Sequence, residues 1–260
     1  MIEAATLSQR FTDPAELRRA ARTGDFTRTT SGHCAGFAQA NIAILPRQYQ
    51  AEFRTFCLLN PQPLPLLGVY DSPMLPDLGD DIDIRTDVPA YEVFDGERWH
   101  QVGDVIDFWR YDSVTFALGC SFGFEGVLMD AGVPIRNIEQ GRTVSMYDTN
   151  IPTAHTTLFN APMVVTMRPL RADQVEIARK VTGSLPGAHG APVHVGRDCD
   201  AIGITDLSQP DYGDPVTIRD DEVPVFWACG VTANAALRRA GIPHVVHKPG
   251  RMLVTDVRLS

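Results

Sequence analysis

The stretch Leu118-Gly-Cys-Ser-Phe-Gly-Phe-Glu125 joins a short apolar run to an amphipathic one. Residues 114–118 are rich in β-branched and aromatic side chains, which predicts a buried strand, and the residues after Ser121 have helical spacing. Cys120 is therefore expected at a strand-to-helix turn. The first backbone N–H groups of a helix have no partner within the helix, and their partial positive charge can hold an anion or favour a thiolate.

The same pattern recurs later in the chain. Residues 114–142 align without a gap on residues 223–251, and Cys120 falls on Cys229 at an offset of 229 − 120 = 109. Eight of the 29 aligned positions are identical, against roughly two expected from average composition. We interpret this as an internal duplication of one βα unit. The alternative is a coincidence, in which the two segments share only the turn and helix-end residues that any two such units have in common. Ligands of open α/β sheets bind beyond the carboxyl ends of strands, so a pocket between the two units is expected.

The segment between the repeats has a different order of expected strands and helices, which predicts a small α+β insertion. Its expected strands cover 163–169, 192–195 and 202–206, and its expected helix covers 172–181. The fold class that we predict is α/β, with an internally duplicated βα core, a mixed sheet flanked by helices and the smaller inserted domain. The predicted main domain covers 1–150 and 223–260, and the insertion covers 151–222.

Other elements precede the first repeat. Asp13-Pro14 ahead of good helix formers predicts a helix over 15–22, and residues 46–59 have helical spacing. Asp95-Gly96 between alternating segments predicts a β-hairpin over 91–102. The glycine-containing stretch 31–41 fits either a loop that approaches a ligand or a tightly packed turn.

Composition limits the classes of function. The 260 residues carry a net charge of −9, which argues against nonspecific nucleic-acid binding because that needs a basic face. No window has the length of apolar sequence that a membrane span needs, and residues 1–10 lack the features of a signal peptide, so we expect a cytoplasmic protein. Five cysteines without paired spacing favour free thiols.

Five motifs together resemble one known family. They are Gly119–Glu125, Met146–Asn150, His189–His194, Val223–Thr232 and Pro249–Asp256. In this order they resemble the hydro-lyases of the D-glutamate cyclase family, nearly end to end. The resemblance implies a carbon–oxygen lyase, with cyclisation of D-glutamate to 5-oxo-D-proline and water as the one named reaction. The chain departs from the family pattern at Phe37, Gly123 and Arg251, where tyrosine, serine and histidine are usual.

The candidate site residues follow from the helix starts and from the motifs. The candidate catalytic residues are Cys120, Glu125, Cys229 and His247, and the candidate substrate-binding residues are Ser121, Tyr147, Asn150, Arg168, Gly230 and Thr232. Both thiols could act as acid or base, or could simply be small residues at tight turns. Glu125 fits a base and a helix cap equally well. The family motifs run through Tyr147, Asn150 and His247, whereas Arg168 is chosen by position alone.

Three functions remain open from the sequence. The first is a cofactor-independent hydro-lyase acting on a small amino or hydroxy acid, and the second is a racemase or epimerase that uses two thiols as paired bases. The third is a protein that binds a small acid without turnover. His189 and His194 match no metal-site spacing, so no metal ligand is assigned and metal dependence stays open. No nucleotide fingerprint is present, so no organic cofactor is expected. The expected partner is the small acid alone, without nucleic acid or membrane, and a homo-oligomer stays open.

Overall fold

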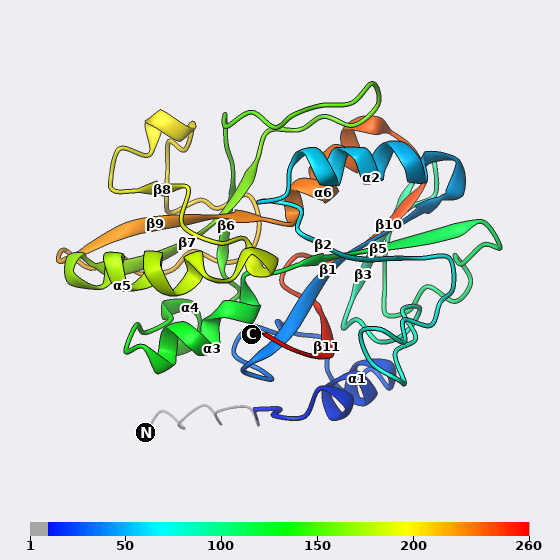
Figure 1. The fold of residues 1–260 in the computed structure, drawn as a ribbon, viewed down its shortest axis with the longest axis horizontal. Coiled ribbons are helices and arrows are strands. Elements are labelled where there is room, and N and C mark those ends of the chain that lie inside the picture. The colour runs from blue at the N-terminus through cyan, green and yellow to red at the C-terminus, as the bar shows by residue number, and fades with distance from the viewer. Residues whose placement is uncertain (1–9, 260) are drawn as a thin grey trace.

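The computed structural model describes residues 10–259 as two antiparallel sheets that lie side by side and are covered by helices (Figure 1). The larger sheet has seven strands in the order β2-β5-β1-β10-β3-β4, and the seventh strand, β11, also pairs with β1. Its strands are β1 (Phe37–Pro46), β2 (Leu66–Tyr70), β3 (Tyr91–Phe94), β4 (Trp99–Val102), β5 (Ser113–Gly119), β10 (His244–His247) and β11 (Leu253–Arg258).

The smaller sheet has four strands in the order β6-β7-β9-β8. Its strands are β6 (Ser145–Asp148), β7 (Val164–Arg171), β8 (His194–Val195) and β9 (Glu222–Cys229). The helices are α1 (Pro14–Arg22), α2 (Gln50–Leu59), α3 (Phe122–Asp130), α4 (Arg136–Glu139), α5 (Ala172–Gly183) and α6 (Val231–Ala240). Short 3₁₀ turns cover Arg47–Tyr49, Pro186–Ala188 and Asp200–Ile202.

The larger sheet is buried on both faces. On one face α2 and α6 pack against the strands, where the Phe53 and Phe116 rings meet edge to face at 4.8 Å. On the other face the segments before β3 and before β5 supply Leu75, Ile82 and Val105. This double covering explains the nearly continuous apolar run of β1, since both faces of the strand must be buried.

The smaller sheet is covered in the same way. Its inner face packs against α3 and α5 through Phe124, Ala178 and Trp227. Its outer face is covered by the segment before β9, with Ile202, Ile204 and other apolar side chains. The helix-facing side of this sheet is the one that meets the end of the larger sheet.

Several predicted elements are confirmed. The helix at α1 begins after Asp13, whose side chain accepts the Ala15 N–H at 2.8 Å, and the predicted hairpin is β3–β4. Both strand-to-helix units are present as β5–α3 and β9–α6. The strand predicted over 202–206 is wrong, because a 3₁₀ turn there ends at Gly203 with φ of +81°.

The predicted mixed sheet is also wrong, since every ladder between the described strands is antiparallel. The two βα units lie in different sheets, with β5 in the larger one and β9 in the smaller one. The smaller sheet takes β7 and β8 from the predicted insertion, and β6 and β9 from the predicted main domain. The duplication and the domain division stay predictions about how the chain is built.

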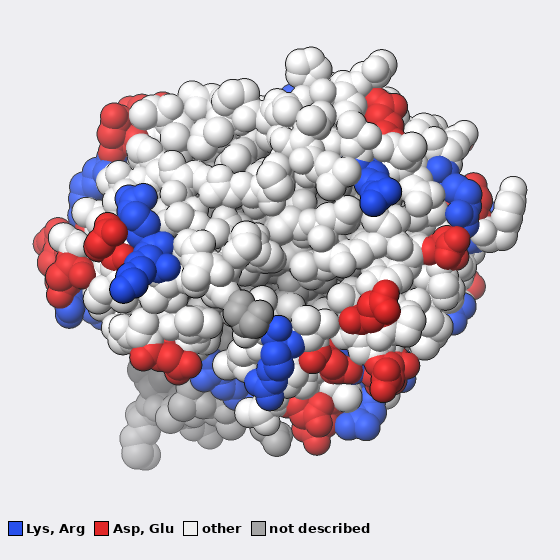
Figure 2. Space-filling model, viewed as in Figure 1, with Lys and Arg blue, Asp and Glu red and all other residues white. Residues whose placement is uncertain are grey.

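None of the helices within residues 10–259 is long and apolar enough to cross a membrane. The prediction about a signal peptide rests on residues 1–10, most of which lie outside the described residues. On the face drawn in Figure 2, acidic and basic side chains alternate around the rim, and the described part of that face carries no continuous basic patch.

Candidate active site

The ends of β5 and β9 meet where the two sheets adjoin. Cys120 follows the last residue of β5 and Cys229 is the last residue of β9, and both belong to one apolar cluster with Phe122, Val231 and Met252. The two cysteines are 7% and 6% exposed. The structure therefore brings the two predicted helix starts together, as a shared site requires.

The two turns also have the same backbone conformation. Ser121 has φ −62° and ψ −16°, and Gly230 has φ −66° and ψ −13°. Neither helix has a side-chain cap at this end. The Phe122 N–H donates to the Cys120 sulfur at 3.5 Å, and the Val231 N–H lies close enough to the Cys229 sulfur to lower its pKa. At each turn the first N–H group of the helix thus lies beside the cysteine, and helix starts of this kind are suited to carboxylates.

Asn41, on the central strand β1, lies between the two turns. Its Nδ2 donates to the Gly119 carbonyl at 2.7 Å. A Cβ added to Gly230 would lie 2.2 Å from the same nitrogen, so the amide packs directly on the Gly230 backbone. Asn41 is 2% exposed. The sequence analysis did not select Asn41; the available signal was two polar residues, Gln39 and Asn41, within an apolar run.

Glu125 and Arg168 form a buried ion pair next to the turns. The Arg168 Nη2 donates to Glu125 Oε1 at 2.8 Å, and both side chains are 1% exposed. The other carboxylate oxygen accepts from the Ser31 hydroxyl at 2.8 Å and from the Gly32 N–H at 3.1 Å. With both oxygens occupied, Glu125 is arranged as a positioning group that joins α3 to β7 and to the segment before β1.

Arg168 also contacts the first turn directly. Its Nη2 donates to the Ser121 hydroxyl at 3.2 Å, and its Nη1 donates to Thr166 Oγ1 at 3.2 Å. The guanidinium carbon lies 4.9 Å from the centre of the Phe124 ring. The Nε atom is buried and has no partner among residues 10–259. Arg168 therefore places a fixed positive charge beside the thiols and keeps one unused donor.

The environment keeps both thiols protonated. Burial raises the pKa of Cys120 far above its usual value, with further contributions from Cys229 and Glu125, and Arg168 opposes the shift. Burial likewise raises the pKa of Cys229 to about 11, and Arg168 again opposes it. At neutral pH the pair can donate protons, but neither sulfur is a resting thiolate.

Two other predicted residues stabilise the surrounding backbone. The Thr232 hydroxyl donates to the Cys229 carbonyl at 2.7 Å and accepts the Val164 N–H at 2.9 Å, which fixes the start of α6 against β7. The His247 Nδ1 accepts the Ile42 N–H at 3.2 Å, between β10 and β1. Burial lowers the pKa of His247 to about 4, so its ring is neutral at pH 7.

Tyr147 and Asn150 are not brought to the thiols. Tyr147 faces the outer side of the smaller sheet, where its hydroxyl donates to the Leu207 carbonyl at 2.7 Å. Asn150 is exposed. Tyr147 lines a polar hollow of about 410 Å³ together with Asp206 and Asp211. The neighbouring Met146 points the other way, into the cluster of Cys120 and Cys229, as strand alternation requires.

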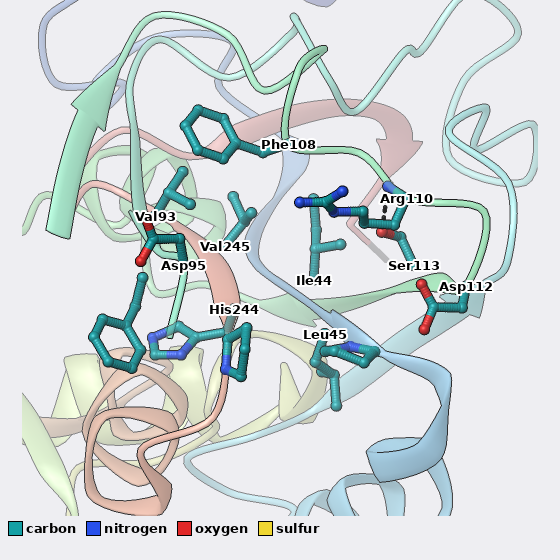
Figure 3. Close-up of a pocket in the computed structure, with 13 residues that line it drawn as sticks. Ile44, Leu45, Val93, Asp95, Phe108, Arg110, Asp112, Ser113, His244 and Val245 are labelled. Atoms are coloured by element: carbon teal, nitrogen blue, oxygen red, sulfur yellow. Dashed lines mark hydrogen bonds between the residues drawn. The ribbon is translucent and has the colours of Figure 1, made fainter. Parts of the chain in front are cut away.

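A second hollow lies at the far end of the larger sheet (Figure 3). It encloses about 90 Å³, and in Figure 3 the Arg110 guanidinium extends across it above Ile44. Ser113, at the start of β5, lines it, whereas Cys120 follows the other end of the strand, about 23 Å away at the usual rise per residue. This hollow is therefore separate from the thiol site. No group of three His, Cys, Asp or Glu side chains within residues 10–259 is arranged to hold a metal ion.

Comparisons with known proteins agree with these motifs. Residues 114–256 match the model of the D-glutamate cyclase family. A protein of Bradyrhizobium diazoefficiens is 50% identical and one of Corynebacterium urealyticum is 51% identical, and the alignments cover 94% of this chain and 92% and 94% of theirs. A Burkholderia ambifaria protein is 49% identical over 94% of this chain and 96% of its own. All three carry the name "Putative hydro-lyase".

Among solved structures, a nitrogen repressor-like protein from Methanococcus jannaschii aligns with 94% of this chain and 98% of its own, with 11% identity and a TM-score of 0.39. That likeness is too distant to bear on fold or function.

Proposed function

Because the chain belongs to the D-glutamate cyclase family, and is therefore a lyase, we propose that it releases water from a small amino or hydroxy acid bound between Cys120 and Cys229. The reaction that fits best is cyclisation of D-glutamate to 5-oxo-D-proline. The proposal is carried by one observation: two uncapped helix starts converge on a pair of protonated thiols beside a buried arginine.

Binding follows from the helix starts. Each of the two carboxylates of glutamate accepts N–H groups at one start, near Ser121 and near Gly230. Arg168 lies close to both thiols and adds a positive charge that the Glu125 carboxylate holds in place. The dry surroundings strengthen these interactions because little water competes for the carboxylates.

The chemistry is a transfer of protons within the site. The substrate nitrogen forms a bond to the side-chain carboxylate carbon, and one carbon–oxygen bond of that carboxylate breaks. The ammonium gives up two protons, and the departing oxygen takes up two protons to leave as water. Cys120 and Cys229 pass these protons on and end the cycle protonated, as they began, so that no cofactor is consumed. Such proton transfer typically contributes 10²–10⁴-fold to a rate.

Replacement of either thiol tests this role. We expect Cys120→Ser or Cys229→Ser to lower kcat for 5-oxoproline formation by about 10²–10⁴-fold, because the hydroxyl is a poorer acid at this position. The matched control is Cys199→Ser, since Cys199 is also 7% exposed but lies on the outer face of the smaller sheet. Equal kcat values for all three variants would contradict the role of the thiol pair.

The paired thiols also fit the two-base racemase that the sequence left open. Incubation of the wild-type protein with D-glutamate in D₂O separates the two functions. A racemase exchanges the α-hydrogen for deuterium, whereas the cyclase forms 5-oxoproline with the α-hydrogen retained. Thermal stabilisation by D-glutamate with neither exchange nor product would instead indicate a binding protein.

A further inference from the structure

Gln39 lies on β1 next to the thiol site and has no role in the scheme above. In the ladder of β1 and β5, Ala40 is opposite Gly119 and Asn41 is opposite Leu118. The ladder ends at the Ala40–Gly119 pair, and Gln39 and Cys120 are the residues next to this pair on the two segments. Gln39 and Asn41 are two residues apart on β1, so their side chains lie on the same face of the strand. The Thr30 carbonyl accepts a hydrogen bond from Gln39, the Thr30 hydroxyl accepts the Met252 N–H at 3.2 Å, and Met252 packs in the apolar cluster of both thiols. Gln39 is 1% exposed.

The hydrogen bonds of Gln39 fix the orientation of its amide. Its Nε2 donates to the carbonyls of Thr30 and His33, each at 3.2 Å. Both partners are acceptors, so the group that meets them must be the nitrogen. The Oε1 atom then points away from these carbonyls. It is buried and has no donor among residues 10–259.

An unpaired buried oxygen of this kind is costly and needs an explanation. Of the two polar atoms of the Gln39 amide, only Nε2 bonds to the segment before β1, and the oxygen makes no hydrogen bond within the described residues. The side-chain oxygens of Thr115, Asn137 and Asn234 are also unpaired among residues 10–259, and these residues lie on β5, α4 and α6. A donor that arrives with a ligand would complete the hydrogen bonds of this amide.

We propose that Gln39 determines the substrate class: its Oε1 accepts a hydrogen bond from the ammonium group of an α-amino acid held between Cys120 and Cys229. This rests on the proposed function and deepens it. The carboxylates of the substrate accept hydrogen bonds only, so the amino group is the part that can satisfy Oε1. A charged donor makes a stronger bond than the hydroxyl of a hydroxy acid. This contact also places the ammonium beside Cys120, where its protons are passed on.

The test compares ligands that differ only at this group. Dissociation constants are measured by calorimetry for D-glutamate, L-glutamate, 2-hydroxyglutarate and glutarate, with the wild-type protein and with Gln39→Met. For the wild type we expect glutarate to bind at least tenfold more weakly than the better enantiomer of glutamate, because the hydrogen bond to a charged group is lost. In Gln39→Met the affinity for glutamate falls to that of glutarate, and glutarate affinity changes less than threefold.

The control variant is Gln174→Met. Gln174 is also buried, but its Oε1 already accepts the Arg171 N–H at 3.2 Å, so the preference for glutamate should persist. If Gln39→Met shows no cooperative melting, the proposal is tested by the dissociation constants of the four acids for the wild-type protein alone. Equal binding of glutamate and glutarate by the wild type overturns the role of Gln39 but not the proposed acid-binding site between Cys120 and Cys229. Binding of none of the four acids overturns both.

Discussion

Gly230, at the start of α6, has no room for a side chain. Its backbone is in the right-handed helical region, with φ −66° and ψ −13°, so an alanine there would be free of conformational strain. The added Cβ would nevertheless lie 2.2 Å from Asn41 Nδ2 and 2.3 Å from Asn41 Cγ. The requirement for glycine at position 230 thus comes from packing against Asn41. A pair of substitutions can measure this steric effect on stability.

We expect Gly230→Ala to lower the free energy of unfolding by about 1–3 kcal/mol, because an inserted methyl group forces neighbouring groups aside. The double variant Asn41→Ala with Gly230→Ala should recover much of this loss, since the amide that caused the overlap is gone. Urea unfolding of the three proteins measures both effects. Gly103→Ala, where nothing lies within 4 Å of the new Cβ, should change stability by less than about 0.5 kcal/mol. A Gly230→Ala protein as stable as wild type would contradict the contact.

At the scale of elements, the Glu125–Arg168 pair connects α3, which follows the larger sheet, to β7 of the smaller sheet. Burial of two charges is tolerated because each one has several partners. The carboxylate accepts three hydrogen bonds, from Arg168, Ser31 and Gly32. Removal of one charge leaves the other without compensation in a site that excludes water.

Glu125→Gln should therefore cost about 3–5 kcal/mol of unfolding free energy, as is typical when one partner of a buried ion pair is removed. The comparison is Glu139→Gln. Glu139 pairs with Arg136 at 2.9 Å, but its side chain is 47% exposed, so a loss of at most about 1 kcal/mol is expected there. Urea unfolding measures both losses. Equal losses of unfolding free energy in the two variants would show that burial does not strengthen the interaction of Glu125 with Arg168.

At the scale of the whole molecule, buried neutral histidines link stability to pH. Burial lowers the pKa of His33, His189, His244 and His247 to about 4 each. Their ordinary value is about 6.5, so the unfolded chain binds protons first as the pH falls. The stability that these groups contribute is fully present above pH 6.5 and is lost as the pH falls through about 4.

The free energy of unfolding should therefore fall between pH 6.5 and pH 4, by up to about 1.4 kcal/mol per pH unit for each histidine. His189→Asn should flatten this slope by about one histidine's share. Asparagine tolerates the positive φ of +75° at this position. His155 is exposed, so His155→Asn should leave the slope unchanged. A slope that is the same in both variants would contradict the role of His189.

Local patterns were enough to identify the elements that carry the site. The apolar run before Cys120, its recurrence before Cys229 and the hairpin around Asp95 depend on residues that are near each other in the chain. The same holds for the motifs that place the chain in its family. These features predicted two thiols at helix starts, and the structure places both in one cluster.

Only the tertiary structure revealed what surrounds the thiols. The sequence analysis missed the central strand β1, because Gln39 and Asn41 interrupt its apolar run and glycines precede it. Those two polar residues are acceptable inside the sheet because backbone carbonyls accept their amide N–H groups: Thr30 and His33, just before the strand, for Gln39, and Gly119, 78 residues away, for Asn41. Contacts between distant segments also decided the other two outcomes. Arg168, chosen by position, is paired with Glu125, and Tyr147, chosen from a motif, faces away from the thiols. Which face of a strand meets the site depends on sheet pairing, and pairing joins residues that no local pattern relates.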